Sequence, residues 1–176
     1  MLIYEALKKD HDKLKPLLAT LVKSSTADEE TRSSLISQIR DELIPHSRAE
    51  EAIFYNSLRT IEGTKALVAH NYTEHLEAEA LLRSLQTMDA MNIEWKKTAQ
   101  KLKAALEHHI AEEEGKIFAA ARLVLIDEEA RLMAQAFEQM KPEIREGSFV
   151  QSTLDFIVNV MPTRFANQLR DFIHRA

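Results

Sequence analysis

Two stretches of the sequence carry histidine and glutamate at a spacing that suits metal binding. The first, HSRAEEAIFYNSLR, begins at His46, and the second, HIAEEEGKIFAAAR, begins at His109. Each reads histidine, three residues and two glutamates, continues to an Ile-Phe pair, and has an arginine thirteen residues after the histidine. Residues four apart project from the same face of a helix. We therefore expect His46 and Glu50 to lie on one helical face, and His109 and Glu113 on another.

Two further histidines share a sequence context of their own. His11 opens HDKLKPLLATL and His75 opens HLEAEALLRSL, each with a leucine pair six and seven residues later and another leucine ten later. His75 follows His11 by 64 positions, and His109 follows His46 by 63. The matching offsets indicate a helical hairpin of about 63 residues that is present twice. Two such hairpins predict an all-α, up-down-up-down antiparallel four-helix bundle with pseudo-twofold symmetry.

The composition supports helices and excludes several classes of protein. The 176 residues include 3 glycines and 4 prolines, and they lack cysteine, so disulfides and thiolate metal sites are excluded. The net charge of −5 argues against nucleic acid or an anionic membrane surface as a partner. No stretch approaches the roughly 18 apolar residues of a membrane helix, and the first residues do not resemble a signal peptide. These features predict a soluble, cytoplasmic protein.

Apolar periodicity and breaker residues divide the chain into segments. We expect helices at Ile3–Lys23, Glu29–Leu58, Leu67–Met88 and Ile93–Leu125, a fifth helix from Asp127 that ends before Pro142, and a last amphipathic segment, Phe149–Ile173, interrupted at Met161-Pro162. Residues 1–125 are then the metal-binding bundle and residues 126–176 a C-terminal helical extension. The apolar side of the extension predicts packing on the outside of the bundle, a homodimer interface, or a cover over the route to the metals.

The predicted bundle buries groups that need a partner. His11, His46, His75 and His109 face inward, with Glu50 and Glu113 one turn beyond two of them. Unpartnered imidazoles and carboxylates would be costly in an apolar interior, and bound metal offsets that cost. Two carboxylates from opposing helices suit a bridged pair of metals, and ligation by imidazole and carboxylate suits iron, manganese or zinc.

These motifs together resemble the hemerythrin-like HHE cation-binding family. The matching elements are the His11-Asp12 pair, HSRAEE, the Glu74-His75 pair and HHIAEEEGKIF, and they cover about residues 3–125. The resemblance implies two non-heme iron ions with an oxo or hydroxo bridge. It also implies that Glu50 and Glu113 bridge the two irons. Two histidines are then terminal ligands on each iron, His11 and His46 on one, and His75 and His109 on the other.

Helix three departs from the pattern of the oxygen-carrying hemerythrins. Those proteins have one more histidine, one turn before the match to His75, where this chain has Asn71. His70 is one residue out of register, about 140° around the helix from His75, and Tyr72 is the other neighbour. His70 and Tyr72 are therefore weaker candidate ligands. One iron is expected to keep an additional open or water-filled position, which argues against reversible oxygen carriage.

Three functions remain open at this point. The first is a diiron-binding protein that binds dioxygen or a related small ligand, or senses iron or oxidant status, and we prefer it to an enzyme. The second is a diiron enzyme that acts on peroxide or nitric oxide. The third is a metal-free helical interaction module. Glu51 and Glu114, which follow the two proposed bridges, are expected behind the ligands or in solvent.

Overall fold

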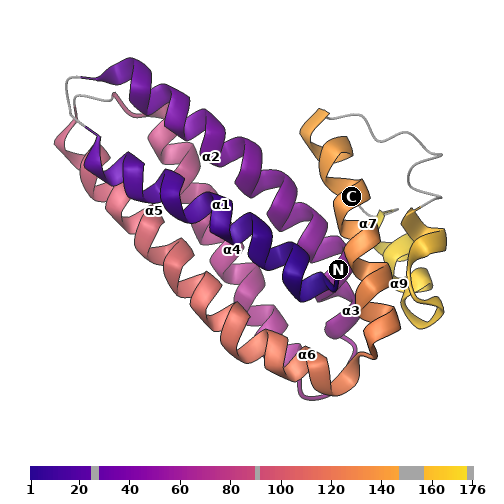
Figure 1. Ribbon diagram of the computed structural model, residues 1–176. Helices are drawn as coiled ribbons and strands as arrows, with labels where there is room; N and C mark the ends of the chain where they lie inside the picture. Colours follow the sequence, from indigo (N-terminus) through magenta and orange to yellow (C-terminus); the bar gives the residue numbers. More distant parts are fainter. Residues whose placement is uncertain (25–27, 90–91, 147–156, 174–176) are drawn as a thin grey trace.

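The computed structural model describes residues 1–24, 28–89, 92–146 and 157–173, and these residues are almost entirely helical (Figure 1). The four long helices are α1 (Ile3–Lys23), α2 (Glu29–Glu50), α4 (Lys65–Thr87) and α5 (Ile93–Glu112). Two of these helices continue beyond a single π-helical turn. The continuation of α2 is η1 (Glu51–Tyr55) and α3 (Asn56–Leu58), and that of α5 is η2 (Glu113–Ile117) and α6 (Phe118–Val124).

The four long helices form the predicted antiparallel bundle. Helices α1 and α2 make one hairpin, α4 and α5 make the other, and α1 packs against α5 while α2 packs against α4 (Figure 1). The turn between the hairpins contains Gly63, whose φ of +89° suits glycine because a side chain is strained there. At the start of α2, the Asp28 carboxylate accepts a hydrogen bond from the Thr31 backbone N–H at 2.9 Å. The predicted fold class is confirmed.

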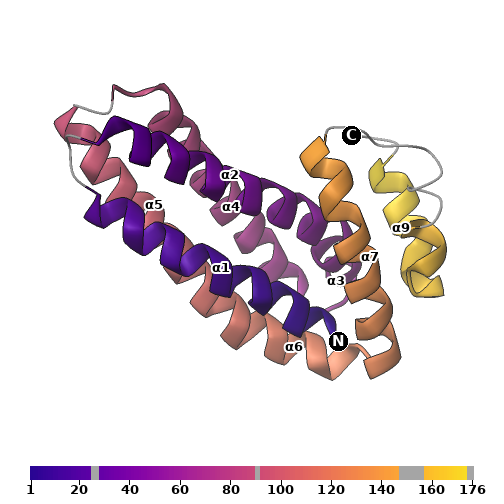
Figure 2. The same cartoon turned by 45° about the horizontal axis from the view of Figure 1, so that its top comes forward.

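Two further helices pack on one end of the bundle. Helix α7 (Asp127–Glu146) crosses α1 and α2, and α9 (Thr163–Ile173) lies against α3 and η1 (Figure 2). Residues 157–160 form another helical turn, and the chain leaves the helical conformation at Met161-Pro162, as the sequence predicts. The first part of the predicted last segment, residues 149–156, lies outside the described residues.

The prediction that the fifth helix ends before Pro142 is wrong, because α7 continues to Glu146 with Pro142 inside it. Proline removes only one backbone donor and disfavours the helix locally. Tertiary contacts hold the last turn. Arg145 Nη2 donates to the Asp41 carbonyl at 2.9 Å and to the Glu42 carboxylate at 3.2 Å. These bonds attach the end of α7 to α2.

The apolar core is divided into two clusters by a layer of polar side chains. Along α1, for example, Leu7 and Leu14 are both buried but belong to different clusters, and His11 lies between them at helical spacing. One cluster fills the end of the bundle where α1 and α4 end and α2 and α5 begin. The other cluster is shared with α3, α6, α7 and α9. Among the described residues, no helix combines the length and apolarity that crossing a bilayer requires.

Candidate metal centre

The polar layer brings together the six residues that the sequence singles out as ligands. Their exposed fractions are 1% for His11, 2% for His46, 5% for His75, 4% for His109, and 0% for both glutamates, Glu50 and Glu113. One histidine comes from each long helix. The two glutamates stand at the duplicated π-turns, Glu50 immediately before η1 and Glu113 as the first residue of η2. Single π-turns inside α-helices often mark functional sites.

The Nε2 atoms of the histidines face the two glutamates. Glu50 Oε2 lies 3.4 Å from Nε2 of His46 and 3.4 Å from Nε2 of His75, and Glu113 Oε2 lies 3.2 Å from Nε2 of His11. The Nε2 atoms of His75 and His109 are 3.1 Å apart. With metal–ligand bonds of about 2.1 Å, neighbouring ligand atoms on one cation are about 3.0–3.4 Å apart. These separations match that range.

The four histidine rings lie in two pairs. The rings of His11 and His46 have centroids 5.0 Å apart, and those of His75 and His109 are 4.6 Å apart. Each pair combines a histidine from α1 or α4 with one from α2 or α5, so the two halves of the centre follow the two hairpins.

The Nδ1 atoms of the four histidines of the centre point away from it toward carboxylates, and three of them lie at hydrogen-bond distance. Glu51 Oε1 lies 2.9 Å from Nδ1 of His75, and Glu114 Oε1 lies 3.0 Å from Nδ1 of His11. These two glutamates occupy equivalent positions in the repeats, and each reaches a histidine of the other hairpin. A carboxylate only accepts hydrogen bonds, so Nδ1 carries the proton and Nε2 keeps a lone pair for a metal.

The remaining two carboxylates were missed as site residues by the sequence analysis. Glu74 Oε2 lies 3.1 Å from Nδ1 of His109, and Asp10 Oδ2 lies 3.5 Å from Nδ1 of His46, which is an ion-pair distance without a hydrogen bond. Each precedes a histidine of the centre in the sequence, so the repeat alignment could have revealed them. Asp12, which the sequence analysis quoted instead, is exposed.

The two central glutamates cannot both be ionised at low energetic cost without a cation. Burial and the neighbouring Glu50 charge raise the pKa of Glu113 well above its usual value. Burial also acts on Glu50, but the neighbouring Glu113, His46 and His75 outweigh it and hold the pKa of Glu50 low. The metal-free pair therefore shares one proton, as adjacent buried carboxylates do. A cation between them would replace that proton.

Several buried atoms of the layer have no hydrogen-bond partner among the described residues. They are both carboxylate oxygens of Glu50, Oε2 of Glu113, Nε2 of His11 and Nδ1 of His46. Such groups are normally satisfied, because desolvation without a partner is costly. The three carboxylate oxygens and the Nε2 atom face the centre and are metal-ligand types, so the residues fit a bound cation.

The histidines differ in their protonation without metal. Burial lowers the pKa of His75, but hydrogen bonds to Glu50 and Glu51 outweigh it and raise the pKa to about 9. Burial and the nearby His46 lower the pKa of His11 to about 3. At neutral pH the metal-free centre thus holds protons on Glu113 and His75, and metal binding must release them.

Tyr55 lies beside Asn71, the position where oxygen-carrying relatives would supply a further histidine. The fully buried Tyr55 hydroxyl lies 3.0 Å from Glu113 Oε1 and 3.3 Å from Asn71 Oδ1. The sequence analysis missed Tyr55 because it follows Ile53 and Phe54 in what reads as an apolar core stripe. Burial and the charge of Glu113 raise its pKa well above the usual value, so the hydroxyl keeps its proton.

The two weaker candidates lie outside the six-residue cluster. The Tyr72 hydroxyl donates to the Glu51 backbone carbonyl at 3.1 Å, and its ring packs on Tyr55. The His70 side chain is 56% exposed and faces Glu74 and Glu112 on the outer side of α4 and α5. The arrangement of the two side chains therefore does not support the prediction that they bind metal at the buried centre.

Helix α7 covers one side of the centre. The fully buried Phe137 packs edge-on against the His46 ring, with centroids 5.7 Å apart. Lys141 Nζ donates to Asp10 Oδ2 at 2.6 Å, and Lys13 donates to Oδ1 at 2.9 Å. These hydrogen bonds fix the carboxylate behind His46, so the C-terminal extension helps to position the centre.

Two curated proteins are similar in sequence to this chain. The chain is 28% identical over 153 residues to a DNA nickase from Nostoc sp., which covers 87% of this chain and 43% of that protein. The chain thus spans less than half of the length of that relative. It is 29% identical over 141 residues to an uncharacterized hemerythrin-like protein from Schizosaccharomyces pombe, covering 79% of this chain and 68% of the relative.

A solved structure shares the fold. It is that of a hemerythrin HHE cation-binding domain-containing protein from Mycobacterium kansasii, with a TM-score of 0.73, 20% sequence identity, and coverage of 96% of this chain and 99% of that one. The model of the hemerythrin HHE cation-binding domain matches residues 2–121. Together with the duplicated helical hairpins and the buried histidine–glutamate layer, this match shows that the chain belongs to the hemerythrin HHE cation-binding family.

Proposed function

We propose that the protein binds two non-heme iron ions at the buried layer and binds dioxygen or a related small ligand there. The ligands are the four buried histidines and two buried glutamates, His11, His46, Glu50, His75, His109 and Glu113. Glu50 and Glu113 would bridge the ions. The observation that carries the proposal is the set of unpartnered Nε2 and carboxylate oxygen atoms buried at metal-ligand separations.

The surrounding residues determine how such a centre would behave. Iron supplies reversible electron transfer and an exchangeable coordination position. The carboxylates of Glu51, Glu114 and Glu74 hold the imidazole tautomers that leave Nε2 free for a metal. The two apolar clusters exclude bulk water from the centre. Asn71 in place of a histidine leaves one ligand fewer than in the oxygen carriers, and Tyr55 holds a proton at that side of Glu113.

We do not extend to this chain the nicking activity for which the Nostoc relative is named. The chain spans 43% of that protein. Its net charge of −5 disfavours contact with the phosphate backbone. We therefore propose no nucleic-acid partner.

Metal analysis and absorption spectroscopy of the untreated, aerobically purified protein test the proposal. We expect about two iron ions per chain and near-ultraviolet bands of an oxo-bridged pair. Glu113→Gln should lose the bands and most of the iron, whereas Glu107→Gln, an exposed glutamate on the same helix, should retain both. Well under one equivalent of iron in the wild type would refute the proposal.

A second candidate function is a diiron enzyme that acts on peroxide or nitric oxide. The observation that favours it is the Tyr55 hydroxyl, a proton donor within 3.0 Å of Glu113. Tyr55→Phe should then reduce peroxide turnover by the iron-loaded protein while the iron content stays unchanged. An absence of turnover in the wild type, together with a spectral change on deoxygenation, would favour ligand binding.

Homodimerisation through the C-terminal helices stays a prediction. Helix α7 and the helical residues 157–173 bury apolar side chains against the bundle, including Phe137, Phe165 and Leu169. Light scattering of the purified protein would determine whether a second copy also packs on this end.

A further inference from the structure

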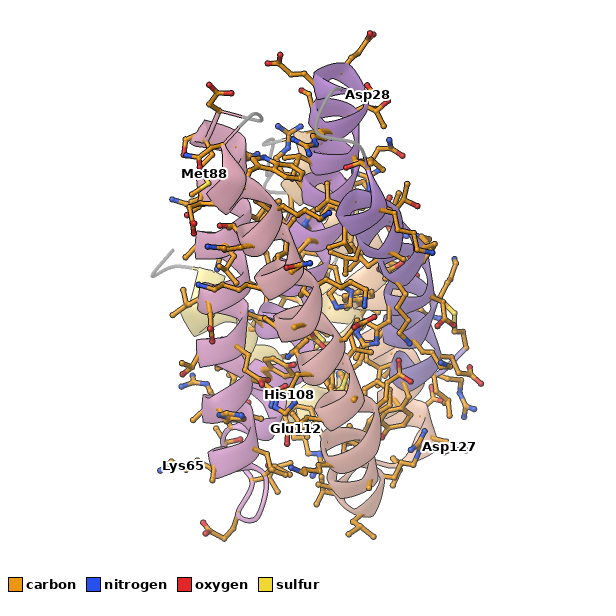
Figure 3. All side chains as sticks on the ribbon, turned by 90° about the vertical axis from the view of Figure 1, so that its left-hand side faces the viewer. Asp28, Lys65, Met88, His108, Glu112 and Asp127 are labelled. Atoms are coloured by element: carbon orange, nitrogen blue, oxygen red, sulfur yellow. The ribbon has the colours of Figure 1, made fainter. Side chains whose placement is uncertain are left out.

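A second group of histidines and glutamates lies on the outside of the bundle, where α4 and α5 meet. Its members are His70, Glu74, His108 and Glu112, and one ligand atom of each lies within 4.8 Å of all the others. In each helix the histidine and glutamate are four residues apart, so they share one face. Figure 3 shows His108 and Glu112 on the side of α5 that borders α4. The cluster thus joins two i, i+4 pairs on facing helices.

The separations within this cluster suit a shared cation better than direct hydrogen bonds. Glu74 Oε1 lies 3.4 Å from His70 Nε2 and 3.6 Å from His108 Nε2, and Glu112 Oε2 lies 3.6 Å from His70 Nε2. Good N–H···O hydrogen bonds are about 2.9–3.0 Å. Two ligands of a tetrahedral cation with bonds of about 2.1 Å lie about 3.4 Å apart. A modest adjustment of the exposed imidazoles would therefore close the coordination.

The burial of the members also fits a metal site that is open to solvent. The side chains of His70 and His108 are 56% and 64% exposed, so they can rotate and exchange ligands quickly. Those of Glu74 and Glu112 are 12% and 19% exposed. Glu74 Oε2 is held by His109, and Glu112 Oε1 is held by Lys116, which leaves the other oxygen of each glutamate facing the histidines. The two glutamates thus lie on the inner side of the cluster and the two exposed imidazoles on its outer side.

We propose that His70, Glu74, His108 and Glu112 form a second, exchangeable site for a divalent transition-metal cation. Two imidazoles and two carboxylates without thiolate suit zinc or cobalt(II), and a solvent-exposed site gives a bound cation a direct path in and out. The site lies outside the buried layer and shares with it only the contact of Glu74 with His109, and it would bind metal whether or not the buried layer holds iron.

Glu74 links this site to the buried layer. One of its oxygens contacts the Nδ1 side of His109, and the other faces the surface cluster. A cation on the outer oxygen would draw negative charge away from the inner one. Occupancy of the surface site would thereby weaken the hold of Glu74 on His109.

Zinc titration of the protein as purified tests the proposal. Calorimetry, with metal analysis before and after dialysis against zinc, should show one zinc ion per chain beyond the metal already present. The variant His70→Gln/His108→Gln should bind this zinc more than about tenfold more weakly, because even the loss of an outer partner of a metal ligand costs 10- to 100-fold. Both histidines are exposed, so the variant should fold normally.

The matched control is Glu77→Gln/Glu107→Gln, which removes two exposed glutamates from the same two helices. This control should keep the additional zinc. Cobalt(II) in place of zinc should give intense visible bands of tetrahedral coordination in the wild type and in the control, but not in the histidine variant. Equal zinc stoichiometry and affinity in wild type and histidine variant, or an equal loss in the control, would overturn the proposal. Iron content, measured separately after dialysis, should be the same in the wild type, the histidine variant and the control, because the six buried ligands are unchanged.

Discussion

Glu51→Gln is the substitution that tests most directly how the outer carboxylates tune the centre. Glu51 lies outside the proposed ligand set, yet its Oε1 accepts the Nδ1 proton of His75 at 2.9 Å. Glutamine has nearly the same size, so the change removes charge and little packing. Arg48 loses the contact with Glu51 at 3.1 Å but retains both hydrogen bonds to Glu79 at 2.8 Å. The fold should therefore survive.

The expected magnitude depends on pH. Losing such an outer partner weakens metal binding by about 10- to 100-fold, or about 1.4–2.7 kcal/mol. A second effect opposes this loss near neutral pH. Burial lowers the pKa of His75, but hydrogen bonds to Glu50 and Glu51 outweigh it and raise this pKa to about 9. The pKa should therefore fall when one of the two carboxylates is removed. A cation then competes with fewer protons at His75. We expect Glu51→Gln to show the full loss of metal affinity at pH 9 and a smaller loss at pH 7.

Competition with a chromophoric chelator measures the affinity at both pH values. Glu77→Gln, which removes an exposed charge two residues from His75, is the control and should bind metal as the wild type does. Glu114→Gln is the duplicate of the test variant, because Glu114 contacts His11 at 3.0 Å. Glu51 does not tune the centre through His75 if Glu51→Gln binds metal as tightly as the control at pH 9. The same holds if its loss of metal affinity is larger at pH 7 than at pH 9.

Three further outcomes follow from the geometry. Metal affinity should rise as the pH approaches 9, because Glu113 and His75 hold protons in the metal-free centre that metal binding must release. The same chelator competition at a series of pH values measures this rise. Lys141→Met should destabilise the fold by about 1–3 kcal/mol in chemical denaturation, because buried Asp10 loses a hydrogen bond, whereas exposed Arg131→Met should change little. Gly63→Ala should lower the unfolding free energy by about 1–2 kcal/mol because its φ is +89°, and Gly115→Ala, where an added Cβ meets nothing within 4 Å, should not lower it.

Helix positions were predictable because local patterns determine them. The first helix, Ile3–Lys23, and the continuous span Glu29–Leu58 agree with the structure, since apolar residues recur there at helical spacing and polar connections flank them. The end of the fifth helix was not predictable. Proline at position 142 is a breaker by local rules, but contacts of Arg145 with α2 outweigh it.

The outer carboxylates show where local reasoning stops. His11 is flanked by Asp10 and Asp12, and both are plausible partners in the sequence. Which one lies near His46 depends on how α1 is rotated against α2 and α7. In the structure Asp10 is buried with Lys141, whereas Asp12 pairs with Lys8 and Lys15 at the surface.

Tyr55 depends even more on tertiary structure. It lies in a stripe of buried residues and reads as core, and nothing near it in the sequence marks its hydroxyl as polar chemistry. Its partner Glu113 is 58 positions away on the other hairpin. Only the packing of the two hairpins brings the hydroxyl and the carboxylate together.

The sequence by itself determined the duplicated hairpin, the helical bundle and the inward register of four histidines and two glutamates, because periodicity and repetition are local properties of the chain. Tertiary structure alone decided which carboxylate stands behind each histidine, that Tyr55 contacts Glu113, and that His70 lies beside His108 and Glu112 of the facing helix. These outcomes depend on how helices that are distant in sequence are rotated against one another, and no single helix carries that information.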